Sequence, residues 1–200
     1  MHLPAAVASL FLSLFAAPAT AESPPAPVPR ATADDFYSGL EAPITQENVR
    51  VSAEDGYFEV SFNLREVGRV SITVYWEDEG SGRGHVTVGE AVVAEVSFVD
   101  GVLASEWADL TGLQTHQVQD VLASVVQAWQ KNGVTEALGV VSRDGKCEVA
   151  GNIAGASTGT LVGAGCLLLI KKKWCVGAGS FVSKKVTGWI TGKCNGAQNG

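Results

Sequence analysis

Four cysteines are the residues with the most specific chemistry in this 200-residue sequence: Cys147, Cys166, Cys175 and Cys194. An even number of cysteines in an exported chain predicts disulfide bonds. Cys147 and Cys166 are 19 residues apart, and Cys175 and Cys194 are again 19 residues apart. This equal spacing fits two successive closed loops, or a nested arrangement in which Cys147 pairs with Cys194 and Cys166 pairs with Cys175.

If the two segments are helical, only the nested arrangement remains. Nineteen helical residues at about 1.5 Å each place the cysteines of one helix roughly 28 Å apart, and no disulfide spans that distance. Nesting then joins two antiparallel helices by a loop within residues 167–174, which is a usual length for such a connection. Along a straight helix, 19 residues also rotate the side-chain direction by five full turns plus about 100°. The two cysteines of one helix therefore cannot both face the other helix unless one of them lies beyond the helix end.

Glycines at four-residue spacing support a close approach of these two helices. The ridge comprises Gly151, Gly155, Gly159 and Gly163, and the second segment repeats the spacing with Gly188 and Gly192. At an interaxial distance of about 8–10 Å, facing Cα atoms lie roughly 3.5–5.5 Å apart, which suits a disulfide. Each helical glycine costs about 1 kcal/mol relative to alanine, so we expect this hairpin to gain helix from its disulfides or from lipid.

The charge distribution divides the chain into two parts. Residues 22–142 hold 19 acidic and six basic residues, a net charge of −13, whereas residues 143–200 hold two acidic and eight basic residues, a net charge of +6. The sequence therefore predicts five regions. They are a signal peptide at 1–21, a proline-rich linker at 22–35, an acidic α+β domain at 36–138, a junction at 139–146, and a cationic disulfide-bonded region at 147–200.

The acidic part shows the alternation of a β-sheet followed by the period of a helix. Apolar residues alternate in 57–65 and 69–76, and a glycine-rich acidic loop at 77–84 precedes two further strand segments at 85–88 and 91–99. These segments predict an antiparallel meander of four to six strands. A helix that begins after Thr115 as N-cap and stops at Asn132-Gly133 should cover the sheet with one apolar stripe: Val118, Val121, Leu122, Val125 and Trp129.

The expected fold class is therefore α+β, an antiparallel β-meander with one covering helix, followed by a disulfide-stapled, glycine-rich helical hairpin. We expect no enzyme, because the acidic part offers only His85 and His116 as bases and lacks a nucleophile motif. The run Glu77-Asp78-Glu79 lacks the spaced oxygen ligands of a calcium loop, so it is interpreted as a solvated turn. No metal, cofactor or nucleic-acid partner is expected.

The first 21 residues are uncharged in their side chains and end in an Ala-Thr-Ala cleavage pattern, which predicts export. Residues 150–170 are also uncharged, are long enough for a bilayer, and precede Lys171, Lys172 and Lys173. A type I membrane-anchored binding domain is therefore one alternative. It would place Cys175 and Cys194 in a reducing cytosol, where disulfides rarely persist.

The favoured interpretation is that the cationic region acts on membranes. Lysines attract anionic lipid, and indoles favour the interface. The expected lipid-contacting residues are Lys171, Lys172, Lys173, Trp174, Lys184, Lys185, Trp189 and Lys193.

This organisation resembles the precursors of secreted disulfide-bonded peptide bacteriocins, of the sporulation-delaying-protein and halocin C8 types. Residues 34–40 (DDFYSGL) are also similar to an acidic-aromatic-Gly-Leu patch of the first type. The resemblance implies cleavage of the pro-region and toxicity to neighbouring bacteria. The acidic domain would then keep the peptide soluble or inactive, and Arg143 and Lys146 are candidate processing residues. An exported, non-toxic binding module is a further alternative.

Overall fold

The computed structural model describes residues 36, 39–40, 44–78, 80–106, 108–143, 145–171 and 173–197. The expected signal peptide and proline-rich linker lie outside the described residues. The described residues all belong to one compact unit, residues 31–200.

Six antiparallel strands form one sheet in the order of the chain. The strands are β1 (Glu47–Glu54), β2 (Tyr57–Leu64), β3 (Gly68–Trp76), β4 (Ser81–Val88), β5 (Ala91–Val99) and β6 (Val102–Glu106). Tight turns join them, and Gly56 and Gly101 adopt positive φ angles of 77° and 79° that other residues rarely take. The expected antiparallel meander is confirmed. The prediction of a loop throughout 77–84 is wrong, because β4 begins at Ser81 and Gly82 pairs with Trp76.

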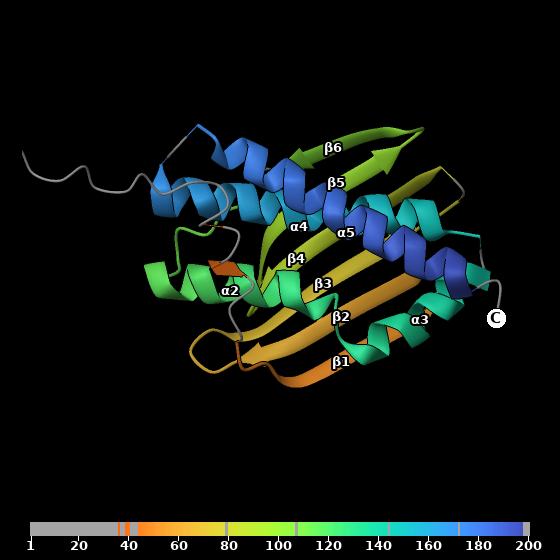
Figure 1. Cartoon of the computed structure of the whole chain (residues 1–200), viewed down its shortest axis with the longest axis horizontal. Helices are drawn as coiled ribbons and strands as arrows, with labels where there is room; N and C mark the ends of the chain where they lie inside the picture. The colour runs from red at the N-terminus through yellow and green to blue at the C-terminus, as the bar shows by residue number, and fades with distance from the viewer. Residues whose placement is uncertain are drawn as a thin grey trace, which may run out of the picture. The chain divides into compact units, whose positions relative to one another are not determined.

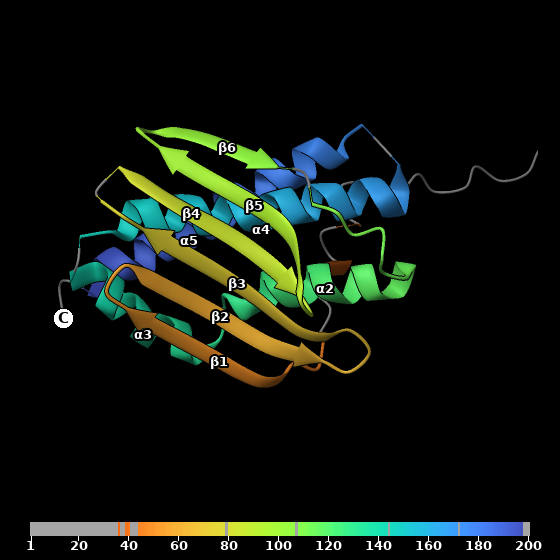
Figure 2. The ribbon, with the colours of Figure 1, turned by 180° about the vertical axis from the view of Figure 1, so that it is seen from behind.

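Four helices follow the sheet: α2 (Thr115–Ala128), α3 (Asn132–Arg143), α4 (Cys147–Ile170) and α5 (Cys175–Ala197). Figure 1 shows the helices in front of the sheet, and Figure 2 shows the opposite face of the sheet without a helix. Helix α4 packs on β3 to β6, α3 on β1 and β2, and α2 on β2. Helix α5 lies on the outer side of α4 and contacts α3. The expected α+β fold class is confirmed, and three helices contact the sheet where one was expected.

The helix boundaries near residue 130 also differ from the expectation. The N-cap of α2 is Gln114 rather than Thr115, and its backbone N–H donates to Gln117 Oε1 at 2.9 Å. Asn132 is the first residue of α3 and not a stop signal. Helix α3 forms because its buried residues recur at helical spacing, at Val134, Leu138 and Val141.

One hydrophobic core joins the acidic part and the cationic part of the chain. The predicted apolar stripe of α2 is buried, and Trp129 stacks on Phe58 of β2 with ring centroids 6.0 Å apart. Trp129 Nε1 also donates to Thr158 Oγ1 of α4 at 3.0 Å, and both residues are buried. Residues 139–143 of the predicted junction continue α3, where Val141 and Ser142 are buried. The change of charge along the sequence therefore does not coincide with a gap in the core.

Two glycines in β4 let α4 approach the sheet. A Cβ atom at Gly84 would collide with Ile153 and would lie 2.6 Å from Ser157 Oγ, and a Cβ atom at Gly82 would also collide with Ile153. Cβ atoms essentially never lie this close to other atoms in real structures. Because Gly82 and Gly84 have no side chains, Ile153 packs directly on the backbone of β4.

Replacing Gly84 with alanine should destabilise the fold by about 1–3 kcal/mol, because the added methyl group overpacks the contact between β4 and α4. Gly112→Ala is the control, since Gly112 is exposed and a Cβ atom there would meet nothing within 4 Å. The measurement is the free energy of unfolding in urea. Equal stability of the two variants would contradict the proposed contact.

Candidate functional site: the disulfide-closed helical hairpin

The four cysteines join α4 and α5 at both ends. Cys147 bonds Cys194 and Cys166 bonds Cys175, with Cα atoms 5.5 Å and 5.4 Å apart, so the nested pairing is confirmed. Cys147 and Cys175 are the first residues of their helices, which places one cysteine of each helix at a helix end. All four cysteines therefore lie within α4 and α5, and the expectation that one cysteine of each helix lies beyond the helix end is wrong. All four side chains are buried.

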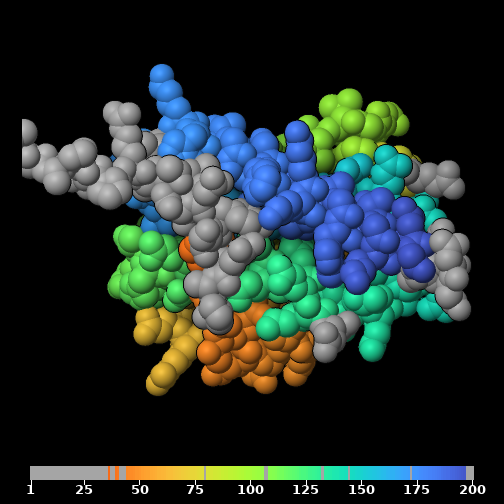
Figure 3. Space-filling view, in the orientation of Figure 1, coloured from red at the N-terminus to blue at the C-terminus, as the bar shows by residue number. Residues whose placement is uncertain are grey.

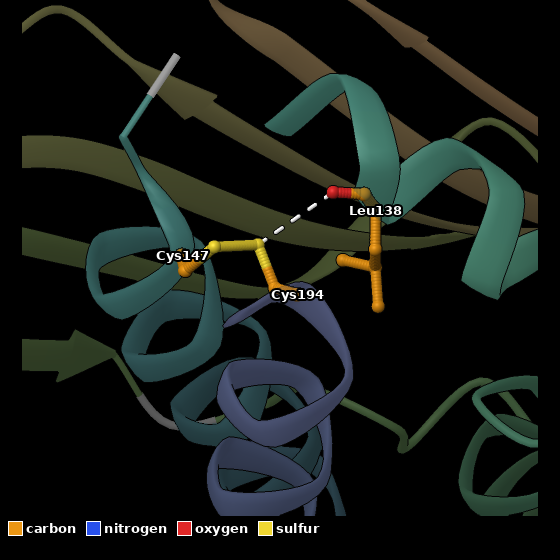
Figure 4. Close-up of a disulfide and its surroundings, with 3 residues drawn as sticks. All are labelled: Leu138, Cys147 and Cys194. Carbon is orange, nitrogen blue, oxygen red and sulfur yellow. Dashed lines mark hydrogen bonds between the residues drawn. A yellow bond between two sulfur atoms is a disulfide. The ribbon is translucent and has the colours of Figure 1, made fainter. Parts of the chain in front are cut away.

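The first disulfide also contacts α3. Cys194 Sγ lies 3.6 Å from the carbonyl oxygen of Leu138. Figure 4 shows this carbonyl group directed toward the disulfide. A disulfide sulfur carries no proton to donate, so we describe this approach as a van der Waals contact. It places the open end of the hairpin against the helix that precedes it.

The predicted glycine ridge of α4 lies against α5. A Cβ atom at Gly155 would collide with Thr187 Oγ1 and would lie 2.6 Å from the carbonyl oxygen of Ser183. At Gly159 it would lie 2.6 Å from the carbonyl oxygen of Gly179, and at Gly151 it would collide with Thr191. A Cβ atom at Gly163 would lie at an ordinary contact distance from Cys175 and Gly179. The close approach of the two backbones is therefore a consequence of the glycine spacing.

The matching surface of α5 differs from the expectation. A Cβ atom at Gly188 or Gly192 would meet no atom within 4 Å, so these glycines do not form the contact with α4. The contact uses small residues that recur at four-residue spacing: Gly179, Ser183, Thr187 and Thr191. Thr187 Oγ1 also donates to the carbonyl oxygen of Gly151 at 3.0 Å. The same spacing rule identifies this ridge once serine and threonine count as small residues.

Helix α4 is the buried centre of the candidate site. By length and composition it is the one helix among the described residues that could cross a membrane, and most of its apolar stretch is buried here. Val149 and Ile153 face β4, and Gly165 lies against Leu122 of α2. In this structure the candidate span is therefore the core helix of the domain.

The predicted lipid-contacting residues lie mostly on the outside. The lysines at 171, 173, 184, 185 and 193 are exposed, whereas Lys172 lies outside the described residues. Trp174 is partly buried with its ring 5.8 Å from that of Phe36, and Trp189 is partly buried against the core. Phe36 belongs to the patch at 34–40 noted in the sequence. The outer surface of the hairpin is thus cationic, and its two indoles are only partly accessible.

The connection between α3 and α4 lies at the surface. Arg143 is exposed at the end of α3, and Gly145 is exposed with a φ angle of 71°. Lys146 is partly buried beside the β3–β4 turn. The backbone N–H of Gly80 donates to Asp78 Oδ1 at 2.8 Å and lowers the pKa of Asp78, with a smaller contribution from the charge of Lys146.

A second surface is the open face of the sheet, which the sequence reasoning did not treat as a site. Tyr75 lies between Tyr57 and His85, with ring centroids 5.3 Å and 5.6 Å away. Burial and a hydrogen bond to Glu59 raise the pKa of Tyr57 to about 12. Burial alone would raise the pKa of Glu59, but hydrogen bonds from Tyr57, Arg69 and Ser61 together lower it. Regular alternation in β2 to β4 is the signal that places these residues on one face.

Comparisons with protein-family models, with curated proteins and with solved structures find no match. Among the described residues, no three histidine, cysteine, aspartate or glutamate side chains are grouped so that they could hold a metal ion. The functional interpretation therefore depends on the hairpin and on the open face of the sheet.

Replacing Gly155 with alanine should destabilise the protein by about 1 kcal/mol or more, because the methyl group forces α5 away from α4. Gly188→Ala is a matched control in the other helix, where alanine should stabilise by up to about 1 kcal/mol through helix propensity. Thermal and urea unfolding of the oxidised proteins measure both effects. Equal effects of the two substitutions would show that the ridge does not control the packing.

The two disulfides should stabilise the fold unequally, because they close loops of different length. The sequence separations are 47 and 9 residues, so chain entropy predicts contributions of about 4 kcal/mol for Cys147–Cys194 and about 2.6 kcal/mol for Cys166–Cys175. The double variants Cys147→Ala with Cys194→Ala and Cys166→Ala with Cys175→Ala test this in urea unfolding. A greater loss in the second variant would contradict the order.

Proposed function

We propose that this protein is the secreted precursor of a cationic, membrane-active antimicrobial peptide. Residues 36–138 would keep the disulfide-bonded region at 147–200 soluble and inactive until the two are separated. The observation that carries the proposal is the position of α4. This apolar helix has the length of a membrane span, and it is covered by the sheet on one side and by α5 on the other.

The covalent structure of the hairpin supports release as one piece. Disulfides close both ends of the α4–α5 pair, so the two helices stay together without the rest of the domain. A single exposed connection between α3 and α4 joins the hairpin to the elements before it. One backbone cut near Arg143 or Lys146 would therefore separate the two parts covalently.

Packing and charge both favour retention of the hairpin before release. Ile153, Leu161 and Val162 are fully buried, and such side chains each contribute about 1.5–3 kcal/mol when removed from water. The two parts also carry opposite net charges, −13 for residues 22–142 and +6 for residues 143–200. A cut hairpin should consequently stay docked in water and leave only when a bilayer offers another apolar environment.

A specific protease site in place of residues 143–146 tests the proposal in the full chain. Cleavage should raise dye release from vesicles that contain phosphatidylglycerol by about tenfold or more, because freed α4 can enter the lipid. The cleaved protein should inhibit bacterial growth, and its hairpin should sediment with the vesicles. Without vesicles, the two pieces should elute together in gel filtration.

The matched control carries the same protease site in the β3–β4 turn at residues 78–81. This cut leaves the hairpin attached to β4 through α3, so dye release should stay at the level of uncut protein. If the 143–146 cut gives no more dye release or growth inhibition than the turn cut, the hairpin is not a latent membrane-active peptide.

A second candidate function is an exported binding module that uses the open face of the sheet. The observation that favours it is the row of Tyr57, Tyr75 and His85 on a face that no described helix covers. Aromatic side chains supply large contact areas in binding surfaces. A cleaved protein that neither leaks vesicles nor inhibits bacteria would favour this function.

A further inference from the structure

A groove runs along the outside of the domain between β6 and α5. Small residues of α4 form its floor, and Leu103 and Val176 stand on opposite walls. The groove has a volume of about 240 Å³ and continues into a second hollow beside Lys184 and Gly188. Figure 3 shows α5 exposed on this face of the molecule, next to the β5–β6 hairpin. The floor residues are Ala156, Gly159, Thr160 and Gly163.

Large apolar side chains are exposed on the two elements that form this groove. Leu103 of β6 and Val176 of α5 line it and are 45% and 54% exposed. Val102 of β6 and Phe181 of α5, on the same elements outside the groove, are 69% and 50% exposed. Soluble proteins seldom expose apolar side chains in such a group unless the surface contacts a partner. The groove is therefore a candidate contact surface of the intact protein.

The charges beside the groove identify the chemistry of that partner. Lys184 lines the second hollow, and Lys185 Nζ lies 5.0 Å from the centre of the Phe181 ring. Among the described residues that line the two hollows, none is acidic, and α5 itself has no acidic residue. A surface that combines protruding apolar groups with lysines matches an anionic lipid interface.

The alternative partner for this surface is a protein strand paired to the edge of β6. That strand has only five residues, which offers a short template for pairing. The exposed apolar side chains also extend beyond it onto α5, where no strand can pair. A lipid surface could therefore contact the exposed apolar residues of both β6 and α5, whereas a paired strand would contact β6 alone.

We propose that the intact, uncleaved protein binds anionic membranes through the groove between β6 and α5 and the adjoining exposed side of α5 that carries Phe181 and Lys185. Leu103, Val176 and Phe181 enter the headgroup region, and Lys184 and Lys185 contact lipid phosphates. This inference extends the proposed function, because it brings the hairpin to its bilayer before any cut, but the binding itself requires no cleavage.

Vesicle co-sedimentation of the uncleaved full chain tests the proposal. The protein should bind vesicles of equal phosphatidylglycerol and phosphatidylcholine, and binding should weaken with salt and be absent from pure phosphatidylcholine. The double variant Leu103→Ser with Phe181→Ser should bind about tenfold or more weakly, because two inserted apolar groups are lost. Lys184→Glu should weaken binding and reduce its dependence on salt while leaving the apolar groups in place.

The matched control is Val92→Ser. Val92 is 57% exposed and lies away from the groove, on β5 where it pairs with Thr87 of β4. The control should bind like the parent protein, and thermal unfolding should show that the control and the double variant are folded. Equal binding by the groove variant and the control would overturn the proposal.

Two further outcomes separate this inference from the proposed function. If the Leu103 and Phe181 substitutions change self-association without vesicles but not vesicle binding, the groove contacts a second copy and the inference is wrong. If the uncleaved chain does not bind anionic vesicles while the 143–146 cut still causes leakage, the inference is wrong and the proposed function stands. Binding before the cut without leakage after it would support the groove and contradict the release of a lytic hairpin.

Discussion

The close packing of α4 on both of its neighbours is the constraint on which the rest of the structure depends. Toward α5, the glycines of α4 bring the two backbones together, and toward the sheet, Gly82 and Gly84 leave space for Ile153. Interiors pack at high density, so one additional methyl group at either contact must displace a neighbouring element. The glycine content of the hairpin, which lowers its intrinsic helix stability, is therefore what lets α4 fit between two layers.

This packing gives the hairpin two properties that rarely occur together. It is covalently independent, because Cys147–Cys194 and Cys166–Cys175 close it at both ends. It is also energetically part of the domain, because its apolar residues share one core with the sheet and with α2 and α3. A segment with both properties can stay buried in the folded protein and remain one covalent unit after a single backbone cut. This is the physical basis of the proposal that the hairpin acts on membranes only after cleavage.

The outer surface of the same hairpin has a different character from its buried side. Helix α5 directs small residues toward α4 and leaves Phe181 and lysines exposed, whereas α4 has few exposed side chains. In the folded protein, the outer surface of the hairpin is therefore cationic and amphipathic. The surface that could span a bilayer becomes accessible only when α4 leaves the core.

Local patterns in the sequence determined much of the architecture. Alternation in β2 and β3 predicts the two faces of the sheet, and the cysteine spacing predicts the nested disulfides once helices are assumed. The glycine spacing in α4 predicts its contact with α5. Each of these inferences depends on residues close together in sequence or on a rigid helical repeat, so no knowledge of distant partners is needed.

Only the tertiary structure decided where the apolar stretch at 150–170 lies. Its composition suits a bilayer and a protein core equally well. The choice is made by β4, whose glycines leave space for Ile153, and by Trp129 at the end of α2, which donates to Thr158. The β-structure of Gly82 and Gly84 and the start of α3 at Asn132 were likewise settled by contacts with elements distant in sequence. Burial is a property of two surfaces that meet, and a sequence pattern describes only one of them.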